Sequence, residues 1–225
     1  IVDALLKAES CRRIIVSNNQ PATNIQDHLK CTDDRVEIFQ QDTVCGPINR
    51  YHIARNCPGD YFVSIDDDVF LTPTQIDRLV EELVADPSRP HGVWGQLLHA
   101  DHDNLSLVSG VHRVNREVNV LNCVYAFTSV QVRRCFELLD MLGLQDLREI
   151  GPGDDIFISM SGGRTPLCHD VGPITLCHSY DLKGVARFRS NNFGARRLRL
   201  WRRLQTVASA EPDAAVLSAT LVRMM

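Results

Sequence analysis

Three consecutive carboxylates, Asp66, Asp67 and Asp68, directly follow a short apolar run, residues 61–65. Short runs rich in aromatic and β-branched residues are typical of buried strands. The carboxyl ends of such strands are where open α/β sheets bind ligands. Adjacent carboxylates repel one another unless cations neutralise them, and hard divalent cations prefer oxygen ligands. This acid turn (residues 66–68) therefore predicts a Mg²⁺ or Mn²⁺ site for a phosphorylated substrate, and the alternative is a solvated acidic turn.

A second acidic cluster, the acid pair Asp154 and Asp155, follows a glycine-rich start and opens an apolar segment, residues 156–158. Acidic residues at the beginning of a helix are stabilised by the helix dipole, so a favourable helix start is one explanation. The other is a second functional carboxylate site. The sequence does not choose between them.

Two later features could supply a metal ligand or positive charges that neutralise a diphosphate. His178 ends a short apolar run. An isolated histidine is more often structural, but a histidine that ends a strand near a carboxylate-held cation could complete the ligand set of that cation. Residues 187–203 are strongly basic, with apolar residues spaced as in an amphipathic helix. This stretch is either a solvated helical face or a site where its first arginines, Arg187 and Arg189, neutralise a diphosphate.

Predicted strands and helices alternate with short connections through the first part of the chain. This rhythm favours an α/β fold with a mostly parallel, doubly wound sheet flanked by helices. The helix over residues 73–85 is the most explicit, because Thr72 can cap it and proline occupies its first position. Residues 99–104, HADHDN, are interpreted as a solvated loop, since their spacing matches no metal-ligand set. We predict helices over residues 1–9, 48–54, 73–85 and 130–142, a helical turn over 24–29, and strands over 12–17, 36–39, 61–65, 92–98 and within 118–128.

Composition limits the class of protein. The 225 residues, 44% of them hydrophobic, suffice for one domain with a substantial core. We place this domain at residues 1–205, with a C-terminal tail at 206–225. The net charge of −4 does not favour nucleic-acid binding, and no apolar run is long enough to span a membrane. Neither a GxxxxGK[ST] phosphate loop nor a GxSxG nucleophile elbow occurs.

The cellular setting is predicted from weaker signals. The chain begins with Ile1 and has no signal peptide, so we expect a piece of a longer protein with any anchoring segment upstream. Eight cysteines without a CxxC pair argue against structural zinc and fit either a few disulfides or buried thiols. With the glycosylation triplet at residues 104–106, they favour the secretory pathway, in the lumen of the Golgi or endoplasmic reticulum.

The acid turn and the acid pair together resemble a nucleotide-sugar glycosyltransferase of the A-type (GT-A) fold. More narrowly, the chain resembles the C-terminal catalytic domain of the exostosin family. SIDDDVFLTPTQID (residues 64–77) matches a segment of that family, Asn49-Arg50-Tyr51 resembles its N-R-F motif, and IIVSNNQP (residues 14–21) stands where it has a strand ending in a W-N-N-like turn. The resemblance covers about residues 10–190.

The chain departs from the exostosin pattern at three points. The second acidic site has Gly153 before two aspartates, where that family has Cys-Glu-Asp. Residues 118–128 lack its glycine-containing acceptor loop. The first strand of the fold would precede residue 1.

The resemblance implies a glycosyltransferase, either a hexosyltransferase or an N-acetylhexosaminyltransferase, that uses Mn²⁺ or Mg²⁺. It would move a sugar from a UDP-sugar to a glycan or protein-linked acceptor. The acid turn would be its DxD motif. Asp155, with Asp154 beside it, would face the acceptor hydroxyl, as general base in an inverting enzyme or as a positioning group in a retaining one. The remaining implied roles are metal binding by Asp66, Asp68 and His178, donor binding by Asn49, Arg50, Asp66, Asp67 and Arg189, and support of the departing phosphate by Arg187.

Two alternatives stay open. A haloacid-dehalogenase-type phosphatase also has an apolar strand ending in DxD and a later Gly-Asp-Asp that holds Mg²⁺. Against it, Phe70 stands where that class has a small or hydroxylated residue. The other alternative is a non-catalytic domain of glycosyltransferase fold that binds glycan.

Overall fold

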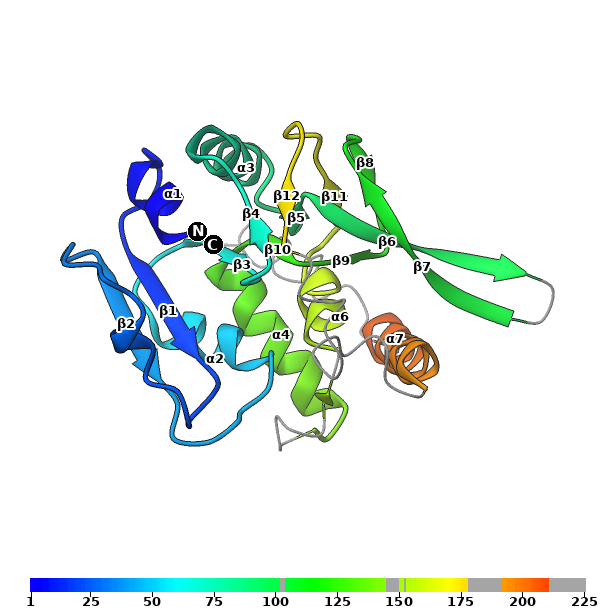
Figure 1. Cartoon of the computed structure of the whole chain (residues 1–225). Coiled ribbons are helices and arrows are strands. Elements are labelled where there is room, and N and C mark those ends of the chain that lie inside the picture. The colour runs from blue at the N-terminus through cyan, green and yellow to red at the C-terminus, as the bar shows by residue number, and fades with distance from the viewer. Residues whose placement is uncertain (102–103, 145–149, 152, 178–191, 211–225) are drawn as a thin grey trace, which may run out of the picture.

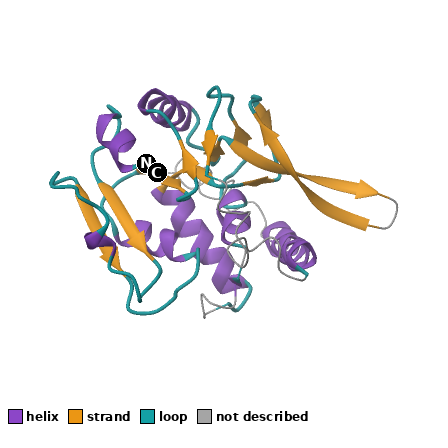
Figure 2. Ribbon diagram, viewed as in Figure 1, coloured by secondary structure: helices purple, strands orange, loops and turns teal. Residues whose placement is uncertain are grey.

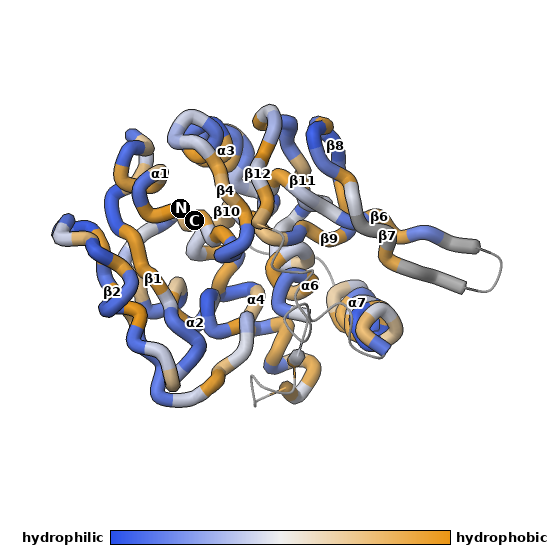
Figure 3. The backbone as a smooth tube through the Cα atoms, viewed as in Figure 1, coloured by the Kyte–Doolittle hydropathy of each residue, from blue (hydrophilic) through white to orange (hydrophobic). Residues whose placement is uncertain are grey.

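The structure is a computed structural model that describes residues 1–101, 104–144, 150–151, 153–177 and 192–210. Figures 1 and 2 show helices on both sides of a set of central strands. The predicted α/β class is therefore confirmed. Hydrophobic residues run along several strands, as β1 and β9 in Figure 3 illustrate.

The helices and strands follow the predicted order closely in the first half of the chain. The helices are α1 (Val2–Lys7), η1 (Ile25–Asp27, a 3₁₀ turn), α2 (Asn49–Asn56), α3 (Pro73–Ala85), α4 (Ser129–Met141), α6 (Asp154–Ser159) and α7 (Phe193–Ala210). The strands are β1 (Ile14–Asn18), β2 (Val36–Gln40), β3 (Tyr61–Ile65), β4 (Val69–Phe70), β5 (His91–Gly92), β6 (Trp94–Asp101), β7 (Asn104–His112), β8 (Arg116–Glu117), β9 (Val120–Leu121), β10 (Val124–Thr128), β11 (Leu167–Cys168) and β12 (Thr175–Leu176).

Two helices begin with the same local arrangement. At α3, the Thr72 hydroxyl accepts a hydrogen bond from the Gln75 amide (3.3 Å), and the Gln75 side chain accepts one from the Thr72 amide (2.8 Å). Thr128 and Gln131 form the same capping box at α4. These reciprocal bonds satisfy backbone donors at a helix start, so both helices have defined first residues.

The main sheet has the order β3-β10-β5-β11-β8, and β1 and β2 form a separate parallel pair. β10 runs antiparallel to both β3 and β5, while β11 runs parallel to β5. The sheet is therefore mixed rather than mostly parallel as predicted. β3 and β5 do run in the same direction, as the strand–helix–strand rhythm implies, but the later strand β10 lies between them.

The central strand β10 separates two hydrophobic cores, because successive side chains of a strand point to opposite faces. Tyr125 and Phe127 belong to the core beneath α2, α4, α6 and α7. Val124 and Ala126 belong to the other core, beneath α1 and α3. All five residues of β10 are buried, so this strand fixes the relative position of the helices on both faces.

A long hairpin, β6 and β7, projects from the body of the molecule in Figure 1. The prediction of a solvated loop at residues 99–104 was wrong, because β6 continues to Asp101 and β7 begins at Asn104. The polar composition concealed these strand ends, which lie on a two-stranded ribbon instead of in a sheet core.

Helix α7 lies against α6 and β7. It continues to Ala210, so residues 206–210, assigned to the tail from sequence, are helical. All eight cysteines lie in the described part of the chain and are free thiols, with Cys135 and Cys168 buried. None of the described helices has the length and apolar content that a bilayer crossing needs.

Candidate active site

The acid turn connects β3 to β4, at the strand end where the sequence placed it. The Val69 amide donates to the Asp66 carbonyl (3.2 Å), which closes the turn. Asp67 is exposed, whereas Asp66 and Asp68 are partly buried. Burial, followed by the negative charges of Asp66 and Asp67, raises the pKa of the Asp68 carboxyl. The turn therefore carries charge that a bound cation would neutralise.

Arg50, near the start of α2, connects the acid turn to the acid pair. Its Nη1 donates to Asp66 Oδ1 at 2.5 Å and to Ser64 Oγ at 3.2 Å. Its Nε lies 3.5 Å from Asp154 Oδ2. The guanidinium also lies over the Tyr125 ring, 5.5 Å from its centroid. Two acidic clusters that are far apart in sequence thus share one arginine.

Asp154 opens α6 and is buried, with 6% of its surface exposed. Burial raises the pKa of its carboxyl to about 6, although the Arg50 charge opposes that shift. The negative charges of Asp155 and Asp66 contribute to this raised pKa. The protonation state of Asp154 therefore changes near pH 6.

Asp155 is equally buried but is held by several donors. Arg197 Nη1 donates to its Oδ1 at 2.6 Å, and Asn122 Nδ2 donates to its Oδ2 at 2.7 Å. The Ile156 amide also donates to Oδ1, at 2.9 Å. Burial of a carboxylate is costly unless it is paired, and here a buried arginine provides the partner. The helix-start explanation and the functional explanation are compatible, since both acids lie in the first turn of α6.

A tight turn between β9 and β10 lies between the two clusters. The Val124 amide donates to the Asn122 carbonyl (2.6 Å) across Cys123, whose φ is +64°. Such a three-residue turn with positive φ is rare and strained, and strain of this kind gathers at functional sites. The Cys123 carbonyl accepts from the Asp66 amide at 2.8 Å. Burial, then the charges of the acid turn and of Asp155, raises the pKa of the Cys123 thiol.

The described residues include no group of three His, Cys, Asp or Glu side chains that could hold a metal ion by themselves. Asp66 and Asp68 nevertheless offer the oxygen ligands that Mg²⁺ and Mn²⁺ prefer. Protein sites for such cations often supply only one or two carboxylates, with substrate phosphates and water completing the coordination. The residues present therefore fit a divalent cation that binds together with a phosphorylated ligand.

The predicted site residues divide into three groups. Arg50, Asp66, Asp154 and Asp155 lie together, with Asp67 and Asp68 on the same turn as Asp66. Asn49 is buried beside Arg50 on α2, and its amide nitrogen has no hydrogen-bond partner among the described residues. His178, Arg187 and Arg189 lie outside the described residues. The Cys177 amide, one residue before His178, donates to the Asp68 carbonyl at 2.8 Å.

Sequence reasoning missed three residues of this site: Asn122, Cys123 and Arg197. Asn122 and Cys123 stand in an apolar run and carry no motif. Arg197 has a detectable signal, because it precedes the buried Trp201 and Leu204 by four and seven residues, the spacing of one helical face. A charged residue on a buried face is expected to have a buried partner.

Comparison with known proteins identifies the family. The sequence profile described as "Glycosyl transferase family 2" matches residues 2–117, more than half of the chain. The chain belongs to glycosyl transferase family 2. The match to this glycosyltransferase family includes the acid turn and ends before the acid pair, so the role of Asp154 and Asp155 depends on the geometry described above.

A solved structure has the same fold as this glycosyltransferase domain. The crystal structure of GalNAc-T7 with UDP, GalNAc and Mn²⁺ matches with a TM-score of 0.57 at 14% identity, over 90% of this chain and 44% of that one. At this identity the likeness shows the GT-A fold, and the chain spans less than half of that protein. No curated protein sequence matches the chain.

Proposed function

We propose that this domain transfers a sugar from a nucleotide-diphosphate donor, a UDP-sugar, to a hydroxyl of a glycan or protein-linked acceptor, with Mn²⁺ or Mg²⁺ as cofactor. The observation that carries the proposal is the position of Arg50, which contacts Asp66 of the acid turn and lies within 3.5 Å of Asp154 of the acid pair. A donor-binding cluster and an acceptor-side cluster must be neighbours for one sugar to pass between them.

The donor side is assigned to the acid turn. Asp66 and Asp68 would hold the cation, with His178 as a further ligand and Asp67 in support. The hydrogen bond from the Cys177 amide to the Asp68 carbonyl supports the assignment of His178, because it brings the preceding residue to the acid turn. When bound, a divalent cation neutralises charge that develops on a departing diphosphate.

Arg50 and Asn49 are assigned to donor binding. Arg50 is already positioned by three acceptors and an aromatic ring, so it can present its guanidinium without further ordering. Arginine suits bidentate contact with phosphate. Arg187 and Arg189 are proposed to steady the departing phosphate. The ligands named for the GalNAc-T7 structure, UDP, GalNAc and Mn²⁺, agree with this choice of donor and cation.

The acceptor side is assigned to the acid pair. In the transfer, the bond from the anomeric carbon to the diphosphate oxygen breaks, and a bond to the acceptor oxygen forms. The acceptor hydroxyl loses its proton, and the diphosphate leaves with the bonding electron pair. Asp155 would accept that proton if configuration is inverted. If configuration is retained, Asp155 would position the acceptor, and the departing diphosphate oxygen would take the proton. Asp154 would act beside Asp155, as a carboxyl group 3.5 Å from the Arg50 guanidinium.

The finer assignments are also proposals. We propose a hexosyl- or N-acetylhexosaminyl-transferase related to the exostosin domain, with the acid turn as a DxD motif, acting in the Golgi or endoplasmic reticulum lumen. The motifs at residues 49–51 and 64–77 support the exostosin relationship. Membership of the glycosyltransferase family argues against the phosphatase alternative.

Metal-dependent hydrolysis of a panel of UDP- and GDP-sugars, followed by transfer to glycan acceptors, tests the proposal. We expect hydrolysis of a UDP-sugar with Mn²⁺ or Mg²⁺ and none with chelator. A thermal shift with Mn²⁺ and UDP measures donor binding separately, because a ligand that binds only the folded state raises the melting temperature. A shift without hydrolysis or transfer would favour the binding-only alternative. Hydrolysis of a general phosphate ester would favour the phosphatase.

A further inference from the structure

Asp155 is held by side chains from two elements outside its own helix. Arg197 of α7 and Asn122 of the β9–β10 turn each bind one of its oxygens. Arg197 also donates from Nη2 to Gln96 Oε1 of β6, at 2.6 Å. The guanidinium therefore connects the C-terminal helix, the long hairpin and the acid pair in one buried arrangement, in which Arg197 is 4% and Asp155 is 5% exposed.

The packing of α7 on α6 holds Arg197 next to Asp155. A Cβ atom on Gly153 would overlap the Leu200 side chain of α7 and something would have to move. Trp201 and Leu204, on the same face of α7 as Arg197, are buried in the core that includes α6. The helix therefore cannot turn about its axis without removing Arg197 from Asp155.

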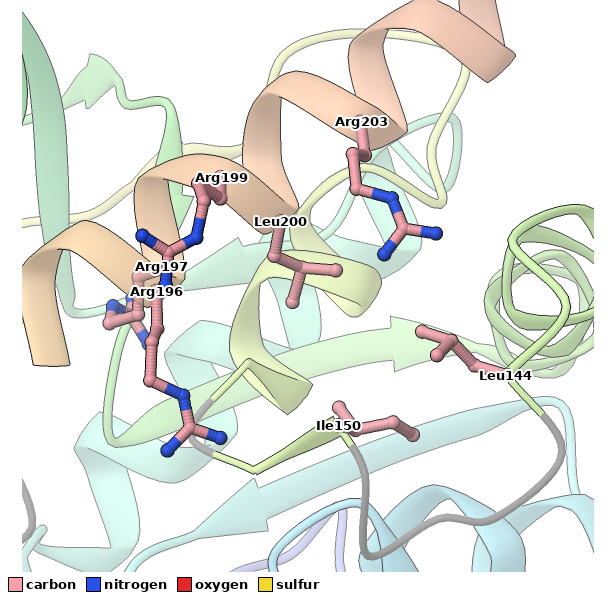
Figure 4. A pocket seen from close by; sticks show the side chains of 7 residues that line it. All are labelled: Leu144, Ile150, Arg196, Arg197, Arg199, Leu200 and Arg203. Carbon is pink, nitrogen blue, oxygen red and sulfur yellow. The ribbon is translucent and has the colours of Figure 1, made fainter. Parts of the chain in front are cut away.

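The other arginines of α7 differ from Arg197. The helix carries five arginines and no acidic residue, yet Arg196, Arg199 and Arg202 are exposed and make no ion pair with any described residue. Arg197 lines a cavity of about 230 Å³. Figure 4 shows the residues that line it: Leu144, Ile150, Arg196, Arg197, Arg199, Leu200 and Arg203. Arg197 thus borders this cavity as well as contacting Asp155.

We propose that Arg197 is a positioning residue of the active site, which orients Asp155 toward the acceptor and provides its counter-charge; this inference rests on the proposed function. An ionised carboxylate has about four lone-pair positions. Oδ1 accepts hydrogen bonds from Arg197 and the Ile156 amide, whereas Oδ2 accepts one from Asn122 and from no other described residue. Oδ2 can therefore accept a hydrogen bond from the hydroxyl of the sugar acceptor. Arg197 and Asn122 fix the plane of the Asp155 carboxylate for that hydrogen bond.

The first experiment compares Arg197→Met and Arg197→Lys with the matched control Arg202→Met, an exposed arginine on the same helix. We expect Arg197→Met to lower kcat for transfer about 100-fold, the order of loss that a small misplacement of a reacting group causes. Arg197→Lys keeps the charge but not the fork of donors, so it should lose about tenfold. Arg202→Met should match the wild type. The thermal shift with Mn²⁺ and UDP should be the same in all four proteins.

The second experiment keeps the test valid if Arg197→Met does not fold, because removing one partner of a buried ion pair is strongly destabilising. The double variant Arg197→Met/Asp155→Asn removes both charges and is expected to fold. If Arg197 acts only through Asp155, the double variant should transfer no more slowly than Asp155→Asn alone, since residues that act as a unit are not additive. Multiplied losses would overturn the proposal.

The third experiment uses the cavity beside Arg197. In Arg197→Ala, added methylguanidinium should restore part of the lost kcat, and the same concentration should not change Arg202→Met. Wild-type kcat in Arg197→Met, or a loss that appears in the Mn²⁺–UDP shift rather than in kcat, would overturn the positioning role. Absence of transfer in the wild type would instead mean that the proposed function has failed.

Discussion

The two acidic clusters of this domain are built in opposite ways. The acid turn has three carboxylates within three residues, lies at least partly in solvent, and has Arg50 as an ion-pair partner within the described chain. The acid pair is buried: Asp155 pairs with Arg197, and Asp154 lies 3.5 Å from Arg50, the arginine that it shares with Asp66. The acid turn carries excess negative charge, whereas Asp155 of the acid pair is neutralised by Arg197.

This difference distinguishes an acid turn whose charge suits a cation from an acid pair whose carboxylates are oriented before any ligand binds. Repulsion within the acid turn favours a ligand with positive charge. In the acid pair, the arginines already fix carboxylate orientation, which is the condition for electrostatic preorganisation. Arg50 lies between them, so a ligand that takes Asp66 changes the environment of Asp154.

The largest expected effect comes from Asp68→Ala. It removes a carboxylate from the cluster that carries excess charge, so metal-dependent donor hydrolysis and transfer should be abolished. The measurement is the rate with and without Mn²⁺, with Asp60→Ala as the control, an exposed acid just before β3. Unchanged activity in Asp68→Ala would remove the metal assignment of the acid turn.

The next effect concerns the buried cluster and pH. The pKa of Asp154 is about 6 in the folded protein against an ordinary value of 3.8, so folding takes up a proton between these values. The stability contributed by this carboxyl is present below about pH 4 and is lost as the pH rises through 6, with a difference on the order of 3 kcal/mol.

The Asp154→Asn variant has no ionisable group at this position. Its stability therefore lacks the decrease that ionisation of Asp154 causes in the wild type. The free energy of unfolding of the variant, relative to the wild type, should therefore increase from pH 4 to pH 7. Urea denaturation of both proteins across that range measures it. Parallel pH curves for the two proteins would show that Asp154 is not a raised-pKa carboxyl.

A smaller effect tests how closely α7 must pack on the acid pair. Gly153→Ala places a Cβ 2.2 Å from Leu200 Cδ2, so the end of this half-buried side chain has to move, at a cost of about 1 kcal/mol, the low end of what overpacking causes. Gly194→Ala is the matched control, since a Cβ there meets nothing within 4 Å and replacing a helical glycine gains up to about 1 kcal/mol. Equal melting temperatures for the two variants would contradict the contact.

The smallest effect concerns the turn between the clusters. Cys123 has positive φ, which glycine adopts without strain. Cys123→Gly should therefore be more stable than Cys123→Ala by about 1 kcal/mol, because both variants lose the same thiol and only one keeps the strain. Thermal unfolding compares them. Alanine as the more stable variant would show that this backbone is not strained.

Patterned segments were predicted well from the sequence. The bounds of α3 agree with the predicted 73–85, because capping residues, proline at the first position and apolar spacing all indicate the same start and end. The acid turn was also located, since an apolar strand followed by consecutive acids is a local signal. These features depend on neighbours within about one turn of the chain.

Features that depend on distant residues were not predicted. Nothing in residues 124–128 indicates that this strand lies between β3 and β5, because insertion into a sheet is decided by long-range pairing. The pairing of Asp155 with Arg197 was missed for the same reason, as several arginines in the basic stretch look alike in sequence. Only the burial of one helical face distinguishes Arg197 from its neighbours.

The position of Arg197 in the chain has a consequence for biosynthesis. Domains fold as units from the N-terminus while the ribosome extends the chain, and the counter-charge of Asp155 comes from a helix that begins 38 residues after it. A nascent chain that has released the sheet and α6, but still holds α7 in the ribosomal tunnel, would contain an uncompensated buried carboxylate. The emergence of α7 therefore supplies the counter-charge that the buried Asp155 needs.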